Sequence, residues 1–144
     1  GGTLVHEIVH ALIKPDFPDV PTWFNEGLAS LYEQCDFDGD KIVGLKNWRL
    51  PALKQAIRAG ELRSFEEMIA DPNFYGHAHG GLNDAQARDL RMYMQEKGEL
   101  QRFYRAFRAN VKTDPTGIRT LREMIAPKEM AEFEREWRAW VLAL

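Results

Sequence analysis

Cysteine is nearly absent from this chain of 144 residues, where Cys35 is the only one. A lone cysteine cannot form an intrachain disulfide or build a cysteine-rich zinc module. A basic excess is missing as well, because 19 lysines and arginines face 22 aspartates and glutamates, which leaves a formal net charge of −3. Nucleic-acid-binding domains need a basic surface to hold phosphates, so we expect no nucleic-acid partner.

Long apolar runs are also lacking. The longest covers residues 140–144, far short of the roughly 20 residues that a helix needs to span a bilayer. We therefore expect no membrane span in the chain. Hydrophobic residues still make up 44% of the sequence and aromatic residues 11%, which is enough for a folded core and excludes wholesale disorder.

The length fits a single domain over residues 1–144. Within it, residues 1–35 are expected to form a helix pair that carries the candidate site, and residues 45–144 a helical remainder. The chain begins with Gly1 instead of Met, and its most informative motif starts at residue 6. We therefore expect a fragment or processed form of a longer chain. Its localisation stays open, and would be extracytoplasmic if the full-length protein has a signal peptide.

Helical periodicity runs through most of the chain, and clear alternating strands are missing. Apolar spacing predicts a buried helix over residues 3–13, where Leu4, Ile8 and Leu12 recur at helical intervals. A loop broken by three prolines follows, and Thr22 is placed to cap a second helix over residues 23–34. Residues 36–44 are expected to form an acidic turn with a short hairpin around 41–43. The sequence thus predicts a mainly α-helical fold.

Capping signals divide the remainder into further helices. Pro51 opens one that ends at residue 60, and Ser64 with Glu67 forms a capping box for a short helix to residue 70. Asn83 is expected to cap a helix that reaches residue 97. Three more helices are expected over residues 99–109, from residue 114 and from residue 127.

The strongest chemical signal is the string HEIVH at residues 6–10. His6 and His10 are four residues apart, so both lie on one helical face and their ring nitrogens can converge on one tetrahedral ion at about 2.0–2.1 Å. Glu7 is rotated by about 100° from His6, which places it beside a metal as a general base for water. The alternative is a helix with two packed histidines, but chance produces this pattern only about 0.01 times in such a chain.

A catalytic zinc site needs a third protein ligand and one open position. Glu26, 16 residues beyond His10, is the candidate, because the proline-broken loop lets the second helix fold back antiparallel to the first. Gly27 is expected to let these two helices approach closely. The alternative for Glu26 is a solvated side chain that the helix dipole favours. Ser30, one turn later, is either a partner of the zinc ligand or a small packing residue.

The strings HEIVH and WFNEGLASLYE resemble the gluzincin metallopeptidases, and most of all uncharacterised bacterial zinc peptidases with a WFNEGLA motif. GLKNWRLPALKQAIRAG and AQARDLRMYMQEKGELQRFYRAFR resemble the same subgroup, so the resemblance covers most of the chain. It implies one zinc ion bound by His6, His10 and Glu26, Glu7 as general base, and a peptide or protein substrate. It also implies the helical C-terminal part of a gluzincin-like catalytic domain, without the upstream β-sheet whose edge strand binds substrate.

The group that the chain resembles commonly uses a tyrosine or histidine to stabilise the oxyanion. Asp84 stands where the related sequences often have tyrosine, so weak or absent peptidase activity is expected, with Asp84, like Ser30, as a candidate partner around the site. His77, His79 and Tyr75 lie in a glycine-rich loop and are the candidate replacement donors. The alternative for this loop is an exposed surface segment without a role in catalysis.

Three functions stay open on the sequence alone. They are a zinc metallopeptidase, a zinc-binding but inactive pseudo-peptidase that acts as a binding module, and a purely structural helical module. The C-terminal half carries apolar stripes at helical spacing, which we expect to pack in the core, or to be partly exposed and cause self-association if a preceding domain has been lost. These stripes contain Phe103, Tyr104, Phe107, Phe133, Trp137, Trp140, Val141 and Leu144.

Overall fold

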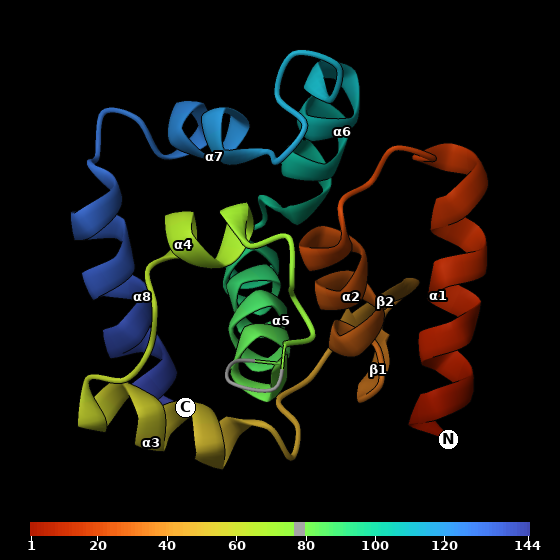
Figure 1. The fold of residues 1–144 in the computed structure, drawn as a ribbon. Helices are drawn as coiled ribbons and strands as arrows, with labels where there is room; N and C mark the ends of the chain where they lie inside the picture. The colour runs from red at the N-terminus through yellow and green to blue at the C-terminus, as the bar shows by residue number, and fades with distance from the viewer. Residues whose placement is uncertain (77–79) are drawn as a thin grey trace.

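A computed structural model describes residues 1–76 and 80–144 of the chain. Within these residues it contains eight helices and one two-stranded antiparallel sheet (Figure 1). The elements are α1 (Gly2–Asp16), α2 (Thr22–Leu31), β1 (Cys35–Asp38), β2 (Lys41–Gly44), α3 (Leu50–Ala59), α4 (Phe65–Ala70), α5 (Gly80–Glu96), α6 (Leu100–Asn110), α7 (Ile118–Ile125) and α8 (Met130–Ala143). The prediction of a mainly α-helical fold is confirmed.

The first two helices pack side by side and antiparallel, as predicted. In Figure 1, α1 runs along one edge of the molecule, and α2 runs back beside it after a short loop. The helix α1 is longer than predicted, because it continues through Pro15 to Asp16. Proline near a helix end costs little more than one backbone hydrogen bond, and the N–H of Phe17 still closes the last turn on the carbonyl of Ile13 at 2.7 Å.

The start and end of α2 also differ from the prediction. Pro21 occupies the cap position, Thr22 is already helical, and no side chain caps the helix. The helix ends at Leu31, earlier than predicted, and the chain turns into a hairpin. Gly39, with φ of 65°, forms the tight turn between β1 and β2. The side chain of Gln95 in α5 bonds both backbone groups of Gly44 at 2.8 Å, which ties the hairpin to that helix.

The helix α5 occupies the middle of the molecule and packs against α2, α3, α6 and α8 (Figure 1). Its first turn corrects one prediction, because α5 begins at Gly80 and Asn83 therefore lies inside the helix instead of capping it. The Asn83 amide is buried, donates to the carbonyl of Phe74 at 2.8 Å and accepts from Arg63 at 2.6 Å. It thereby connects α5 to the segment that precedes it.

The apolar stripes of the C-terminal half form helix-packing faces, which confirms the first of the two expectations for them. Phe103 and Phe107 of α6 are fully buried against Phe24 of α2, and Trp137 of α8 packs on Phe65 of α4 with ring centres 4.8 Å apart. Self-association through these buried rings is therefore not favoured. Tyr104, Trp140 and Leu144 are half-buried and pack against the edge of the same core.

Several exposed apolar side chains lie on α1, which corrects the prediction of a buried helix, and others lie in the hairpin and in loops. Leu4, Ile8 and Leu12 are 64%, 48% and 69% exposed. The spacing was interpreted correctly as helical, but α1 packs on α2 from one side only and lies at the edge of the molecule (Figure 1). Within the described part of the chain, no helix combines the length and apolarity needed to cross a membrane.

Two capping predictions are confirmed. Ser64 accepts a hydrogen bond from the backbone N–H of Glu67 at 3.1 Å, as the capping box requires at the start of α4. Gly60, with φ of 69°, ends α3 in the left-handed conformation that glycine adopts without strain. These local signals place α3 and α4 around one side of α5, with the segment that leads to Tyr75 following them.

Candidate metal centre

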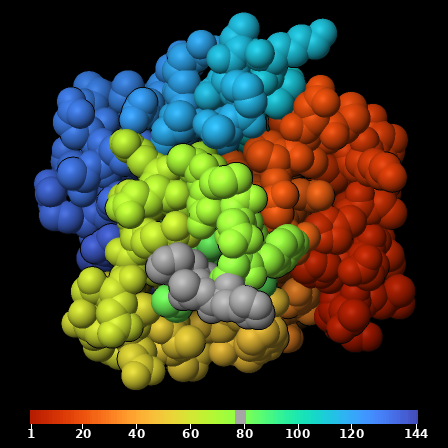
Figure 2. Space-filling view, in the orientation of Figure 1, coloured from red at the N-terminus to blue at the C-terminus, as the bar shows by residue number. Residues whose placement is uncertain are grey.

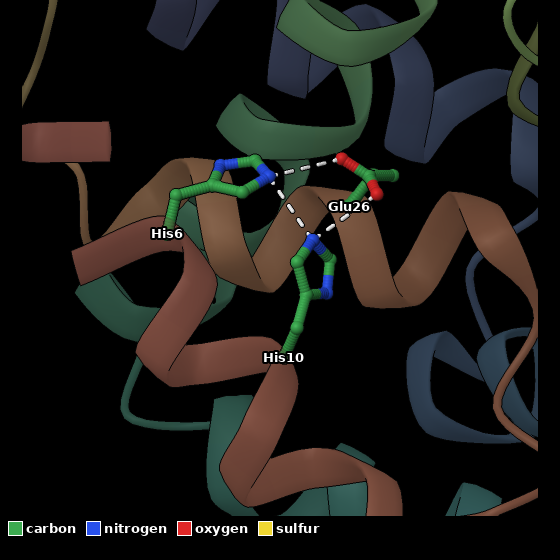
Figure 3. Close-up of side chains that lie close together, drawn as sticks. All are labelled: His6, His10 and Glu26. Atoms are coloured by element: carbon green, nitrogen blue, oxygen red, sulfur yellow. Dashed lines mark hydrogen bonds and ion pairs between the residues drawn. The ribbon is translucent and has the colours of Figure 1, made fainter. Parts of the chain in front are cut away.

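Three side chains from the antiparallel helix pair converge on one point. His6 and His10 come from successive turns of α1, and Glu26 comes from the second turn of α2 (Figure 3). The two Nε2 atoms are 3.0 Å apart. The Glu26 carboxylate faces both rings, with Oε2 at 3.3 Å from Nε2 of His6 and Oε1 at 3.2 Å from Nε2 of His10.

These separations match the spacing of ligands around one small ion. A tetrahedral ion with ligand bonds of about 2.0–2.1 Å holds neighbouring donor atoms about 3.3–3.4 Å apart. The separations of 3.0, 3.2 and 3.3 Å between the donors of His6, His10 and Glu26 lie close to that value. All three side chains are 16–22% exposed, so solvent reaches the centre and a fourth position can stay open.

The outer nitrogen of each imidazole has its own partner. Nδ1 of His6 donates to Oε1 of Glu33 at 2.6 Å, and Nδ1 of His10 donates to Oδ1 of Asn25 at 2.8 Å. A proton on Nδ1 leaves the Nε2 of a neutral imidazole with a lone pair. Both histidines therefore present a metal-ligating nitrogen to the centre of the cluster.

This arrangement calls for a cation. Two Nε2 lone pairs and a carboxylate that face one another at about 3 Å repel each other unless positive charge lies between them. A proton on one imidazole would satisfy part of the cluster, whereas a metal ion would satisfy His6, His10 and Glu26 together. The donor set of two imidazoles and one carboxylate is typical of catalytic zinc.

Glu7 lies on the exposed side of α1, one residue after the first histidine. Among the described residues, none of the hydrogen bonds that hold the cluster comes from Glu7, and its side chain is exposed to solvent. This placement is compatible with the predicted role of a base beside the metal, and that role stays a prediction.

Tyr75 is the described candidate donor whose hydroxyl lies near the cluster. Burial of the hydroxyl, its interaction with the Glu26 carboxylate and the charge of Asp84 raise the pKa of Tyr75 above its ordinary value, although 61% of the residue is exposed. Figure 2 shows the light-green surface before the grey residues extending toward the orange and red surface of α2 and α1. His77 and His79, the other two candidates, lie outside the described residues.

Ser30 and Asp84 lie together beside the centre. The Ser30 hydroxyl donates to Oδ1 of Asp84 at 2.8 Å, and Arg49 contacts the other carboxylate oxygen of Asp84 at 2.9 Å. Burial raises the pKa of Asp84, with support from the charges of Glu26 and Glu33, while Arg49 and Ser30 act in the opposite direction. Asp84 is thus an acceptor with two donors of its own, and its contacts lead to Glu33 and not directly to a candidate ligand.

Three further residues around the centre escaped sequence reasoning. Asn25 precedes Glu26 in the chain, and Glu33 follows Glu26 by seven residues, which is two helical turns. That spacing could have indicated a partner for a histidine. Burial alone would raise the pKa of Glu33, but Arg49 and His6 outweigh it and hold this pKa below its ordinary value. Arg49 itself comes from the loop before α3 and has no local sequence signal.

A groove of about 820 Å³ opens elsewhere on the molecule, among α1, α2, β2 and α6. Its walls are mostly apolar and include Val9, Leu28, Ile42 and Leu100. Polar and charged side chains also line it, namely Asp16, Tyr32, Asp38, Lys41, Gln95, Gln101 and Tyr104. None of the three cluster residues lines it. The groove is therefore a separate feature and not the cleft of the candidate metal centre.

Comparisons with known proteins add no assignment to this geometry. No family model matches the chain, and neither the curated proteins nor the solved structures contain a match to it. The gluzincin resemblance therefore depends on the motifs alone, and the candidate site has to be argued from its own residues.

Proposed function

We propose that this chain binds one zinc ion and hydrolyses peptide bonds. One observation carries the proposal: His6, His10 and Glu26 point three lone-pair donors at a common centre with the spacing of a tetrahedral metal site (Figure 3). The outward bonds of both histidines support it, because they leave Nε2 available on each ring.

The proposed reaction divides its tasks among the side chains around the centre. A bound zinc ion would supply a Lewis acid and lower the pKa of water to about 7. Glu7, beside His6 on the exposed side of α1, accepts a proton from the attacking water and returns it to the leaving amine. Tyr75, whose hydroxyl lies near Glu26, donates a hydrogen bond to the oxyanion that develops on the substrate carbonyl.

The metal site is tested first by metal analysis of the purified chain. We expect one equivalent of zinc, and loss of that zinc from His6→Ala at chelator concentrations that the unaltered chain withstands, because two remaining ligands hold zinc poorly. His79→Ala serves as the matched control, since it removes a histidine that is not a proposed ligand. Equal zinc retention by His6→Ala and by the unaltered chain would refute the site.

A zinc-binding module without hydrolytic activity is the second candidate. The observation that favours it is the state of Asp84, which accepts hydrogen bonds from Ser30 and Arg49 and so cannot donate to an oxyanion. Tyr75 is then the only described candidate for that role. Turnover of a broad peptide library by the zinc-loaded chain, absent in Glu7→Gln, separates the peptidase from the inactive module.

A further inference from the structure

Glu33 is held against His6 from outside the helix pair. It lies two residues beyond the end of α2 at Leu31, within a turn, so the helix alone does not set its side chain. Its Oε1 accepts the Nδ1–H of His6 at 2.6 Å. Arg49 donates to both oxygens of the same carboxylate, from Nη1 to Oε2 at 2.6 Å and from Nη2 to Oε1 at 3.3 Å. This two-pronged contact sets the plane of the Glu33 carboxylate.

Arg49 is itself held from two further directions. Its Nη2 contacts Oδ2 of Asp84 at 2.9 Å, and Asp84 accepts from Ser30 through its other oxygen at 2.8 Å. The ring of Trp48 lies 4.0 Å from the guanidinium carbon. These contacts form a closed circuit. They lead from Ser30 in α2 to Asp84 in α5, then to Arg49 in the loop before α3, and then to Glu33, three residues after Ser30.

We propose that Arg49 is a positioning residue of the metal centre, which holds the Glu33 carboxylate on Nδ1 of His6 and thereby sets the tautomer and the angle at which His6 presents Nε2. The inference rests on the proposed metal site and assigns a role that the ligands themselves do not fill. Arg49 contacts Glu33 and Asp84, neither of which is a candidate ligand, so it acts on the centre through Glu33.

Arg49 can have this effect because it compensates the charge of two carboxylates and restricts the movement of Glu33. One guanidinium lies between the carboxylates of Glu33 and Asp84, and its side chain is only 13% exposed. Without it the two carboxylates lose their shared cation, and Glu33 can rotate away from His6. Residues that orient a metal-ligating histidine in this way typically contribute 10–100-fold to metal affinity.

The test measures zinc affinity by competition with a chromophoric chelator in Arg49→Gln, Arg49→Lys, Glu33→Gln and the double variant Arg49→Gln/Glu33→Gln. We expect about 10–100-fold weaker binding in Arg49→Gln and an intermediate loss in Arg49→Lys, which keeps the charge but not the two-pronged contact. The double variant should bind zinc no more weakly than Glu33→Gln alone, because Arg49 acts through Glu33.

Arg108→Gln is the matched control, because Arg108 also ties α1 to another helix, through Asp16 at 2.6 Å, but at the end of α1 away from the histidines. It should keep the zinc affinity of the unaltered chain. Cobalt(II) absorption of Arg49→Gln should change in band shape, which a loss of stability alone would not produce. Circular dichroism confirms that each variant is folded, and Arg49→Lys carries the test if Arg49→Gln is not.

Unchanged zinc affinity in folded Arg49→Gln and Arg49→Lys would overturn the inference and leave Arg49 with only a structural role, in which it links separate segments of the chain. Additive losses in the double variant would do the same, because they would show that Arg49 acts without Glu33. Failure of the unaltered chain to bind zinc or cobalt is a different result. It would overturn the proposed metal site, and the role of Arg49 with it.

Discussion

At the scale of single residues, the candidate centre is defined by which atom each side chain presents. Glu33 accepts a hydrogen bond from Nδ1 of His6, and Asn25 accepts one from Nδ1 of His10. Both Nε2 atoms therefore face Glu26, at 3.2–3.3 Å. A helix can bring two histidines onto one face without this effect, because ring rotation and tautomer stay free. The partners of the outer nitrogens are what convert two neighbouring imidazoles into a pair of ligands.

Glu7 provides the sharpest residue-scale test of the proposed chemistry. Glu7→Gln keeps the shape of the side chain but removes its ability to accept a proton, so zinc content should stay the same while turnover falls by about 10²–10⁴-fold. Peptide hydrolysis at matched zinc occupancy measures the effect. Glu61→Gln, at an exposed position outside the site, is the control that should leave turnover unchanged. Turnover that survives in Glu7→Gln would exclude Glu7 as the base.

Tyr75 makes a separate prediction. Tyr75→Phe removes only the hydroxyl that lies near Glu26, and loss of one oxyanion donor typically lowers kcat by about 10²–10³-fold. Because the pKa of Tyr75 is raised above its ordinary value, the hydroxyl stays protonated and able to donate through the neutral and mildly alkaline range. The activity of the unaltered chain should therefore not decline in that range through ionisation of Tyr75. A Tyr75→Phe variant with undiminished kcat would place the donor elsewhere.

At the scale of elements, the antiparallel packing of α1 and α2 brings the candidate ligands together, and α5 packs against α2. The helix α5 buries two arginines against α2. Arg88 donates to the carbonyl of Ser30 at 3.1 Å, and the guanidinium carbon of Arg91 lies 4.2 Å from the centre of the Trp23 ring. Both arginines bind backbone carbonyls of α2 and hold the helix that carries Glu26.

Gly27 shows how close this packing is and corrects one expectation. Its role was predicted to be the approach of α1 and α2, but a Cβ atom at Gly27 would lie 2.7–2.8 Å from side-chain atoms of Arg91 in α5. Arg91 is fully buried, so the neighbours that enclose it would have to shift with it. Gly27→Ala should therefore destabilise the fold by about 1–3 kcal/mol, as other overpacked core positions do.

Urea denaturation monitored by circular dichroism measures this change in the free energy of unfolding. Gly81→Ala is the matched control, because it lies in the first turns of α5 and a Cβ there meets no atom within 4 Å. It should leave the free energy of unfolding unchanged or raise it slightly. A Gly27→Ala variant as stable as the unaltered chain would show that Arg91 can adjust and that α2 and α5 are less tightly packed than described.

At the scale of the whole molecule, the proposed metal would be bound by residues of both α1 and α2 in the folded chain, so zinc should stabilise the fold. A ligand present at 100 times its Kd stabilises the folded state by about 2.7 kcal/mol if it does not bind the unfolded chain. For a domain of this size that corresponds to a rise in Tm of about 5–10 °C. Thermal unfolding of the chelated chain, with and without zinc, measures it.

The same measurement on His6→Ala is the control, because a chain that lacks one ligand should show little or no shift. Magnesium at equal concentration should also have little effect, since two imidazoles and one carboxylate suit zinc better than a hard, oxygen-preferring cation. A Tm that does not respond to zinc in the unaltered chain would contradict the proposal that the helix pair closes around a metal.

The sequence by itself determined the features that depend on local spacing. Two histidines four residues apart share a helical face wherever that helix packs, and the capping signals at Ser64 and Gly60 act within one turn. The mainly helical fold and the antiparallel return of α2 followed from the same kind of information. Glu26 could be named as a candidate ligand because the proline-broken loop leaves the second helix few ways to pack.

The surroundings of those residues depend on the packing of distant segments. Leu4 and Leu12 have the apolar spacing of a buried helix, yet they are exposed because α1 has a neighbour on one side only. Arg49 reaches Glu33 and Asp84 from a loop that lies 16 residues from one and 35 from the other. Such contacts depend on how distant segments pack, and no local pattern encodes them. The candidate ligands could therefore be named from the sequence, whereas Arg49, which holds the Glu33 carboxylate, could not.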